Sequence, residues 1–316
     1  MHIVITGGAG FIGSKIAQHL IDRGDEVSLI DNFNDYYDPS LKRDRIAELL
    51  REKEYTLYEG DIRDESFLEK FFSAKPIDKI IHLAAMAGVR ASIENPLLYE
   101  EVNVRGTMLL LEMARKYPVK HFVYASSSSV YGNNKKIPFS EEDSVDHPIS
   151  PYAATKKATE LLANTYKYLY EIPLTGLRYF TVYGPWGRPD MALFTFVKNI
   201  LENKSIDVYN EGRMSRNFTY IDDIVSGTIR VLDSESGLGI MNIGGDREET
   251  LLRFIEVIEE NIGKKAIKNM LPMQPGDVPQ TVADISKLRA LGWEPTTRIE
   301  EGIRSFVEWY RSYYKV

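Results

Sequence analysis

The chain has 316 residues, a length that predicts about two domains and a sizeable core. It carries 39 Lys and Arg residues against 46 Asp and Glu residues, and the resulting net charge of −7 argues against a nucleic-acid partner. The absence of cysteine excludes disulfides, thiol nucleophiles and thiolate metal sites. The 5 histidines are scattered without a His-x-x-x-His pair, so no metal site is predicted.

The first apolar run covers residues 2–6 and has no basic leader, so a signal peptide is not expected. No apolar stretch reaches the length of a membrane span. We therefore predict a cytoplasmic protein without a membrane partner.

A strand, a glycine turn and a helix are predicted at the start of the chain. Ile3-Val-Ile5 leads into Thr6-Gly-Gly-Ala-Gly-Phe-Ile-Gly13, and a helical apolar pattern follows. In such a turn Gly7 permits the tight bend, Gly10 lets the backbone approach a pyrophosphate, and Gly13 allows close helix packing. The N–H groups at the helix start then favour phosphate binding.

The second predicted strand, residues 27–30, ends in Asp31, which lies 31 − 13 = 18 residues beyond Gly13. An acid at this place binds ribose hydroxyls and repels the additional phosphate of NADP. No arginine adjoins it, so the pattern predicts NAD as the cofactor.

Further strands are predicted at residues 55–58, 79–84 and 121–125, with amphipathic helices between them. This alternation indicates an α/β fold with a doubly wound parallel sheet, covered by helices on both faces. Ligands of such sheets bind at the carboxyl ends of the strands. Five predicted strand ends carry candidate binding residues: Gly7, Asp31, Asp61, residues 83–87 and Ser127.

Tyr152 and Lys156 are four residues apart on a helix predicted to begin at Pro151, so they share one helix face. An ammonium near the phenol would favour its ionised form, which is a general base. Ser127 lies 152 − 127 = 25 residues earlier, at a strand end, and its hydroxyl could hydrogen-bond the reacting oxygen. The spacing alone also fits an exposed pair of side chains on a helix without a catalytic role. The nucleotide-binding pattern in the rest of the sequence favours a catalytic role for Tyr152 and Lys156.

We predict a domain transition where the strand over residues 173–179 leads into a loop rich in glycine and proline. Residues 1–180 are predicted as a NAD-binding Rossmann domain. Residues 181–316 are predicted mainly as a smaller C-terminal α/β substrate domain, with some segments returning to the first. Its loops should form a lid, in which Arg216 contacts phosphates or a carboxylate and Arg213 is a surface residue.

The sequence resembles the extended short-chain dehydrogenase/reductases over essentially its whole length, and within them the nucleotide-sugar 4-epimerases. The motifs that carry this resemblance are residues 6–13, Ser126-Ser-Ser-Ser-Val-Tyr-Gly132, Tyr152-x-x-x-Lys156 and Arg216-Asn-Phe-Thr-Tyr-Ile-Asp-Asp223. Two further stretches, residues 31–39 and 178–191, resemble UDP-glucuronate 4-epimerases, which interconvert UDP-glucuronate and UDP-galacturonate.

This resemblance implies roles for individual residues. Ser127, Tyr152 and Lys156 would be catalytic, and Tyr152 and Lys156 would also contact NAD. The other residues implied to bind NAD are Gly7, Gly10, Phe11, Ile12, Gly13, Asp31, Asn32, Asp61, Ile62, Leu83, Ala84 and Ala85. Those implied to bind the UDP-sugar are Ser128, Ser129, Thr181 and Arg188 at the uronate end and Arg216 at the diphosphate.

By the same resemblance, Tyr152 would take the proton of the sugar 4-hydroxyl while hydride passes to NAD, and the 4-keto sugar would rotate before hydride returns. Related 4,6-dehydratases have Asp-Glu immediately before Val-Tyr-Gly, and related UDP-glucuronate decarboxylases have a glutamate immediately before it. In this chain the same two positions are Ser128 and Ser129, which argues against both reactions. A neutral UDP-glucose/UDP-galactose 4-epimerase is the closest alternative, although Met273-Gln-Pro-Gly-Asp277 lacks the arginine pair usual in those enzymes.

A catalytically idle NAD-binding regulator is a further alternative, because fold does not determine function. The joint presence of Ser127, Tyr152 and Lys156 argues against it. By analogy with relatives, the helices around residues 99–115 and 151–170 are expected to pair with their copies in a homodimer. The expected biological role is the supply of precursors for polysaccharide biosynthesis.

Overall fold

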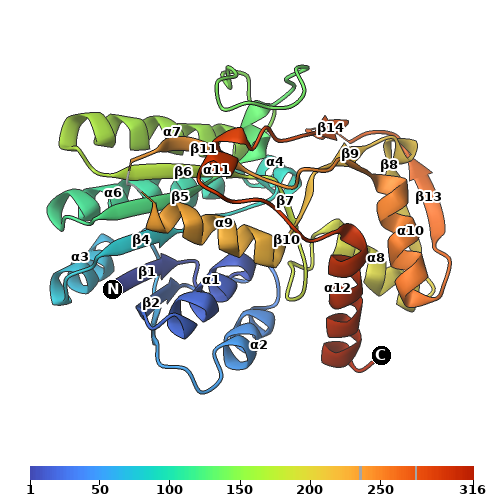
Figure 1. Ribbon diagram of the computed structural model, residues 1–316, viewed down its shortest axis with the longest axis horizontal. Helices are drawn as coiled ribbons and strands as arrows, with labels where there is room; N and C mark the ends of the chain where they lie inside the picture. Colours follow the sequence, from blue (N-terminus) through green and yellow to red (C-terminus); the bar gives the residue numbers. More distant parts are fainter. Residues whose placement is uncertain (235–236, 275) are drawn as a thin grey trace.

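The computed structural model describes residues 1–234, 237–274 and 276–316. A parallel sheet of seven strands forms the larger part of the molecule (Figure 1), and its strand order is β11-β6-β5-β4-β1-β2-β3. The strands are β1 (His2–Thr6), β2 (Glu26–Asp31), β3 (Thr56–Glu59), β4 (Lys79–His82), β5 (His121–Ser127), β6 (Leu174–Tyr179) and β11 (Gly239–Ile243). The strand order reverses between β1 and β4, which is the place where doubly wound sheets bind ligands.

Helices cover both faces of this sheet, as the alternation of strands and helices predicted. On one face lie α1 (Phe11–Asp22), α2 (Pro39–Leu49), α9 (Ile221–Asp233) and α11 (Ser286–Ala290). On the other lie α3 (Glu65–Ala74), α6 (Gly106–Lys116) and α7 (Pro151–Tyr170). Between α3 and α7 the chain also forms α4 (Val89–Glu94), α5 (Pro96–Tyr99), a π-helix (Glu100–Arg105) and a 3₁₀ turn (Ser128–Tyr131).

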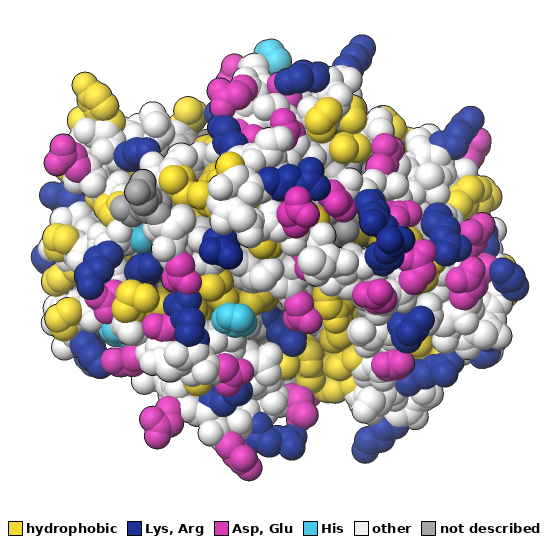
Figure 2. All heavy atoms as spheres, viewed as in Figure 1, with side chains coloured by type: hydrophobic (Ala, Val, Ile, Leu, Met, Phe, Trp, Pro, Cys, Tyr) yellow, Lys and Arg dark blue, Asp and Glu magenta, His cyan; other side chains and the backbone are white. Residues whose placement is uncertain are grey.

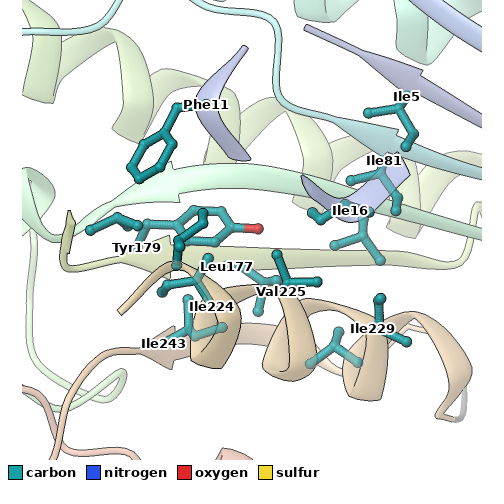
Figure 3. Packing of buried hydrophobic residues seen from close by; sticks show 14 of the residues in the cluster. Ile5, Phe11, Ile16, Ile81, Leu177, Tyr179, Ile224, Val225, Ile229 and Ile243 are labelled. Atoms are coloured by element: carbon teal, nitrogen blue, oxygen red, sulfur yellow. The ribbon is translucent and has the colours of Figure 1, made fainter. Parts of the chain in front are cut away.

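Alternate side chains of each strand point to opposite faces, so neighbouring residues enter different cores. Ile3 and Ile5 of β1 belong to the buried cluster with α1 and α9, whereas Val4 belongs to the cluster with α3 and α6. Figure 3 shows the first of these clusters, in which Ile224 and Val225 of α9 pack below the sheet. Both faces are therefore apolar, as a buried parallel sheet requires.

A separate core, apart from the two clusters that flank the large sheet, lies on the right of Figure 1. It is built from α8 (Ala192–Leu201), β8 (Ser205–Tyr209), α10 (Leu251–Ile262), β13 (Ile267–Leu271) and α12 (Ile299–Tyr314). The remaining short elements are β7 (Thr181–Tyr183), a 3₁₀ turn (Asn210–Gly212), β9 (Ser215–Arg216), β10 (Phe218–Tyr220), β12 (Glu249–Thr250) and β14 (Gln280–Thr281). The residues predicted as an apolar stripe, Ile303, Phe306, Val307 and Tyr310, are buried on α12.

Two segments of the C-terminal half pack with the large sheet and its helices: β11 pairs with β6, and α9 packs on α1. The domain boundary at residue 180 stays a prediction. On the face shown in Figure 2, basic and acidic side chains are interspersed. None of the helices in the described ranges is long and apolar enough to cross a membrane.

Candidate active site

A cavity of about 530 Å³ opens at the carboxyl ends of the central strands. Every residue predicted to be catalytic or to bind cofactor or substrate lines it. These residues are Gly7, Gly10, Phe11, Ile12, Gly13, Asp31, Asn32, Asp61, Ile62, Leu83, Ala84, Ala85, Ser127, Ser128, Ser129, Tyr152, Lys156, Thr181, Arg188 and Arg216. The structure therefore brings together in one cavity residues that are spread over more than two hundred positions of sequence.

The turn between β1 and α1 leaves no room for a side chain at Gly7 or Gly13. Gly7 has a φ of +71°, and a Cβ there would lie 2.8 Å from the Ala84 nitrogen. A Cβ on Gly13 would lie 2.3 Å from the Gly7 carbonyl oxygen. Helix α1 begins at Phe11 without a side-chain cap on its N–H groups. The start of this helix thus offers main-chain donors and positive potential to an anion in the cavity.

Asp31 ends β2 with its carboxylate fixed by the main chain. Its Oδ2 accepts the Ala9 N–H at 3.1 Å and its Oδ1 accepts the Phe33 N–H at 2.9 Å. Lys42, which the sequence analysis missed, also lines the cavity; its buried Nζ lies 3.7 Å from Asp31 Oδ1 and donates to Asn34. No spacing rule could find Lys42, because its place depends on how α2 lies across the end of β2.

Asp61 follows β3 and accepts hydrogen bonds from two neighbours. Arg63 Nη2 and Asn32 Nδ2 each donate to its Oδ2 at 2.9 Å. The Arg63 hydrogen bonds lower the pKa of Asp61 to about 2 despite partial burial. The carboxylate is therefore ionised at neutral pH. The helix α3 is capped by Asp64 instead, so capping does not explain Asp61.

The hydroxyl of Ser127 and the side chains of Tyr152 and Lys156 meet at the end of β5. Ser150 caps α7 by accepting the Ala153 N–H at 3.1 Å, which places Tyr152 in the first turn, just after Pro151. Ser127 Oγ accepts the Ser129 N–H at 3.1 Å, and the Ser127 side chain also hydrogen-bonds Tyr152. Lys156 is buried, and its Nζ donates to the Ala125 carbonyl at 2.8 Å.

The electrostatics of Tyr152 differ from the prediction made from spacing. Burial raises the pKa of Tyr152, and the groups that lower it are the Ser127 hydrogen bond and the Arg188 charge. The pKa of Tyr152 is therefore shifted in the direction opposite to the one predicted, because burial outweighs the groups that favour the phenolate. Burial also lowers the pKa of Lys156 to about 8, and its Nζ donates to the Ala125 carbonyl. An effect of the Lys156 charge on the phenol stays a prediction.

A buried ion pair that the sequence analysis also missed lies beneath Lys156. Glu160, one turn further along α7, binds Arg178 of β6 through two hydrogen bonds of 2.8 and 2.9 Å. Glu160 also accepts the hydroxyl of Ser126 at 2.6 Å. This network ties α7 to the ends of β5 and β6, and so fixes the strand end that carries Ser127.

Arg188 lines the cavity, together with Thr181 at the start of β7. Its guanidinium lies 5.7 Å from the centre of the Tyr36 ring and pairs with Asp190. Although burial alone would lower the pKa of Arg188, the hydrogen bonds and charge of Asp190 raise it above its ordinary value. A permanent cation thus stands in the same cavity as Tyr152.

Arg216 also lines the cavity and is held by main-chain carbonyls. Its Nη1 donates to Ser215 and Pro279, and its Nη2 donates to Val278 at 2.7 Å. Burial lowers the pKa of Arg216, and among the described residues no carboxylate forms an ion pair with it. Its cationic charge is therefore available to an anion in the cavity. Arg213, predicted as a surface residue, is exposed and pairs with Glu211.

The segment predicted to lack a second phosphate-binding arginine, 273–277, includes Pro275, which lies outside the described residues. Its neighbours Gly276 and Asp277 line the cavity beside Arg216. Within the described ranges, no group of three or more histidine, aspartate or glutamate side chains is arranged to hold a metal ion.

Comparisons with known proteins show the family to which the chain belongs. Residues 3–244 match the family described as "NAD dependent epimerase/dehydratase family". A probable UDP-glucuronate 4-epimerase of Rhizobium meliloti is 45% identical over 100% of this chain and 98% of the relative.

Two solved structures extend the comparison. The UDP-glucuronic acid 4-epimerase of Bacillus cereus, in complex with UDP-glucuronic acid and NAD, has a TM-score of 0.94 and 36% identity, covering 99% of this chain and 100% of that one. The UDP-glucose 4-epimerase of Thermotoga maritima, with UDP-glucose, has a TM-score of 0.91 and 32% identity, covering 99% and 100%.

Proposed function

Because this chain belongs to the NAD dependent epimerase/dehydratase family, we propose that it interconverts UDP-glucuronate and UDP-galacturonate by inverting carbon 4 of the sugar. The relatives named UDP-glucuronate 4-epimerase support this substrate and reaction. The single observation that carries the uronate specificity is Arg188, a partly buried cation in the same cavity as Tyr152. A neutral sugar offers no negative charge to such a group.

The cofactor is NAD, and the residues at the strand ends fit it. The glycine turn is closed to side chains and leads into the uncapped start of α1, which suits a pyrophosphate. Asp31 stands where the ribose hydroxyls of a dinucleotide bind, and its charge disfavours a 2′-phosphate. When bound, NAD supplies reversible acceptance of hydride from carbon 4, so the reaction consumes no cofactor.

Tyr152, once ionised with the support of the Lys156 charge, takes the proton of the 4-hydroxyl as carbon 4 is oxidised, and returns it when the ketone is reduced on the opposite face. Ser127, whose side chain hydrogen-bonds Tyr152 in the protein without substrate, donates its hydroxyl hydrogen to the reacting oxygen when substrate is bound. Lys156, with a pKa of about 8, remains mostly protonated at neutral pH and stabilises negative charge near the phenol. Arg216 binds the diphosphate, as its free charge allows.

The 4-keto uronate is a β-keto acid and can lose carbon dioxide. Arg188, Thr181, Ser128 and Ser129 hold its carboxylate away from the orientation that allows this cleavage. Ser128 and Ser129 also stand where dehydratases carry an acid pair and decarboxylases a glutamate, so neither of those reactions is favoured. The neutral-sugar epimerase is the second candidate, because a UDP-glucose 4-epimerase shares the fold at a TM-score of 0.91.

The protein is expected to act as a homodimer. Met108 of α6 and Leu161 and Leu169 of α7 expose apolar surface on neighbouring helices, and a second copy of the chain would cover it. Light scattering on the purified protein tests this: a monomer at micromolar concentration contradicts it. We also propose a cytoplasmic location and a role in polysaccharide biosynthesis.

Incubation of the purified holoprotein with UDP-glucuronate and, separately, with UDP-glucose tests the function. Chromatography with mass detection should show conversion of the uronate to an isomer of unchanged mass and no reaction of UDP-glucose. Loss of carbon dioxide would identify a decarboxylase. Turnover of UDP-glucose alone would identify a neutral-sugar epimerase and remove the role given to Arg188.

A further inference from the structure

The guanidinium of Arg188 is held along one edge only. Its Nε donates to Asp190 Oδ1 at 2.9 Å, and its Nη2 donates to Asp190 Oδ2 at 2.5 Å. This side-on pair uses the edge formed by Nε and Nη2. Among the described residues no acceptor lies within hydrogen-bond reach of Nη1. The other edge, formed by Nη1 and the second Nη2 hydrogen, is therefore free for a carboxylate that binds with two parallel hydrogen bonds.

Asp190 has no evident role in forming the helix that follows it. Helix α8 begins at Ala192, and its first turn has no side-chain cap. The carboxylate of Asp190 instead turns back to Arg188 and accepts the hydroxyl of Tyr36 at 3.3 Å. Tyr36 is 154 positions away in sequence, so a distant part of the chain fixes this carboxylate. Asp190 is also not among the residues that line the cavity, whereas Arg188 and Tyr36 are.

Resting on the proposed function, we infer that Asp190 is a positioning residue for uronate recognition. It grips Arg188 side-on, keeps the guanidinium plane fixed, and leaves the Nη1–Nη2 edge to the carboxylate of the substrate. A guanidinium without this partner would sample other rotamers, and only part of that population could form both hydrogen bonds.

The negative charge of Asp190 also opposes a second carboxylate, so its two effects on uronate affinity have opposite signs. The Asp190 side chain is 35% exposed, and water screens its repulsion of a more distant carboxylate. The orientation of a bidentate pair acts at contact distance and is not screened in this way. Orientation should therefore dominate, and removal of Asp190 should weaken uronate binding.

The test compares Asp190→Ala and Asp190→Asn with the wild-type holoenzyme. For Asp190→Ala the KM for UDP-glucuronate should rise about tenfold, as expected for one lost charge-assisted hydrogen bond, while kcat changes much less. Asp190→Asn keeps one acceptor for Nε and should show a smaller rise. The Kd of UDP-glucose, which has no carboxylate, should stay unchanged. The fraction of product that has lost carbon dioxide should rise with the KM.

Glu211→Ala is the matched control, because Glu211 pairs with Arg213 at the same two-residue spacing but both side chains are exposed and outside the cavity. It should change none of these quantities. If wild type turns over UDP-glucuronate and Asp190→Ala matches Glu211→Ala, the inference is overturned. A lower KM in either Asp190 variant would make Asp190 a competitor of the substrate, which also overturns it.

Two further results keep the test decisive. If Asp190→Ala does not fold, the KM and the UDP-glucose Kd of Asp190→Asn decide the question by the same criteria. If the wild type itself does not epimerise UDP-glucuronate, the proposed function fails, and the inference fails with it for that separate reason.

Discussion

The half of the cavity that we propose for the nucleotide is built mainly from main chain and short side chains, whereas the half proposed for the sugar includes two long basic side chains from short segments that follow β6. The first half, called the nucleotide half, consists of the 6–13 turn, Asp31 and Asp61, which lie at or just beyond the ends of strands of the large sheet; the other is called the sugar half. The second consists of Thr181, Arg188 and Arg216, all from segments after β6.

This difference has a functional consequence. A rigid half suits a cofactor that is bound throughout the reaction, because its contacts need not change. In the proposed reaction the 4-keto intermediate rotates in the sugar half, so we expect its contacts there to come from side chains that bind the two charged ends of the substrate. Substitutions in the first half should therefore act mainly on stability and cofactor retention, and those in the second on KM.

The largest expected effect is at the junction of the two halves. Tyr152→Phe removes the phenol oxygen that accepts the proton and should lower kcat by roughly 10³-fold, within the range of general-base catalysis. The NAD content and the thermal stability should remain close to wild type, because the ring stays packed against Tyr99. Steady-state kinetics and cofactor absorbance measure both; undiminished turnover would exclude Tyr152 as the base.

In the sugar half, Arg216→Gln should raise the KM for the UDP-sugar by roughly 10- to 100-fold, the range for a lost charged hydrogen-bond partner. Retention of NAD should not change. Arg213→Gln, three positions earlier on an exposed side chain, is the control and should leave KM unaltered. Equal effects of the two substitutions would mean that general charge, not a diphosphate contact at Arg216, sets affinity.

The same comparison explains what could be predicted from the sequence. Asp31 and Ser127 were found because hydrophobic patterning marks strand ends, and the ends of parallel strands meet at one edge. Local periodicity likewise placed Tyr152 and Lys156 on one helix face. The position of these residues in a common cavity followed from topology alone.

Other features depend on contacts between distant segments and could not be predicted. Lys42 reaches Asp31 only through the packing of α2, and Glu160 meets Arg178 only when α7 lies on β6. The pair of Asp190 and Tyr36 joins a loop to a segment near the N-terminus. The pKa of Tyr152 was misjudged because spacing reports which charges are near in sequence and not how deeply a group is buried.

In the nucleotide half, two glycines offer a graded test of rigidity. A Cβ on Gly13 would meet the Gly7 carbonyl oxygen at 2.3 Å, whereas a Cβ on Gly10 would lie 3.0 Å from the same atom. Gly13→Ala should lower the free energy of unfolding by about 1–3 kcal/mol, and Gly10→Ala by less. Denaturant unfolding of both variants measures this. A larger loss for Gly10→Ala would contradict the proposed packing of α1 on the turn.

The smallest expected effect concerns Lys156, whose burial lowers its pKa to about 8 from the ordinary value near 10.5. Between these two values the unfolded chain binds more protons than the folded protein, so Lys156 makes the free energy of unfolding rise with pH there. The stability difference between wild type and Lys156→Met should be constant below pH 8. Above pH 8, the wild type should gain stability relative to Lys156→Met by at most ~1.4 kcal/mol per pH unit.

Denaturant unfolding at intervals from pH 7 to pH 10 measures that difference, with Lys204→Met, on an exposed side chain, as the control. A flat difference for Lys156→Met would mean that the ammonium keeps its hydration or finds a compensating charge in the folded protein. Glu160 is the nearest source of such a charge, because it opposes the effect of burial on the pKa of Lys156. A difference that rises with pH would instead show that the buried ammonium of Lys156 lowers the free energy of unfolding of the folded protein. Bound substrate and cofactor would then have to offset that loss of stability.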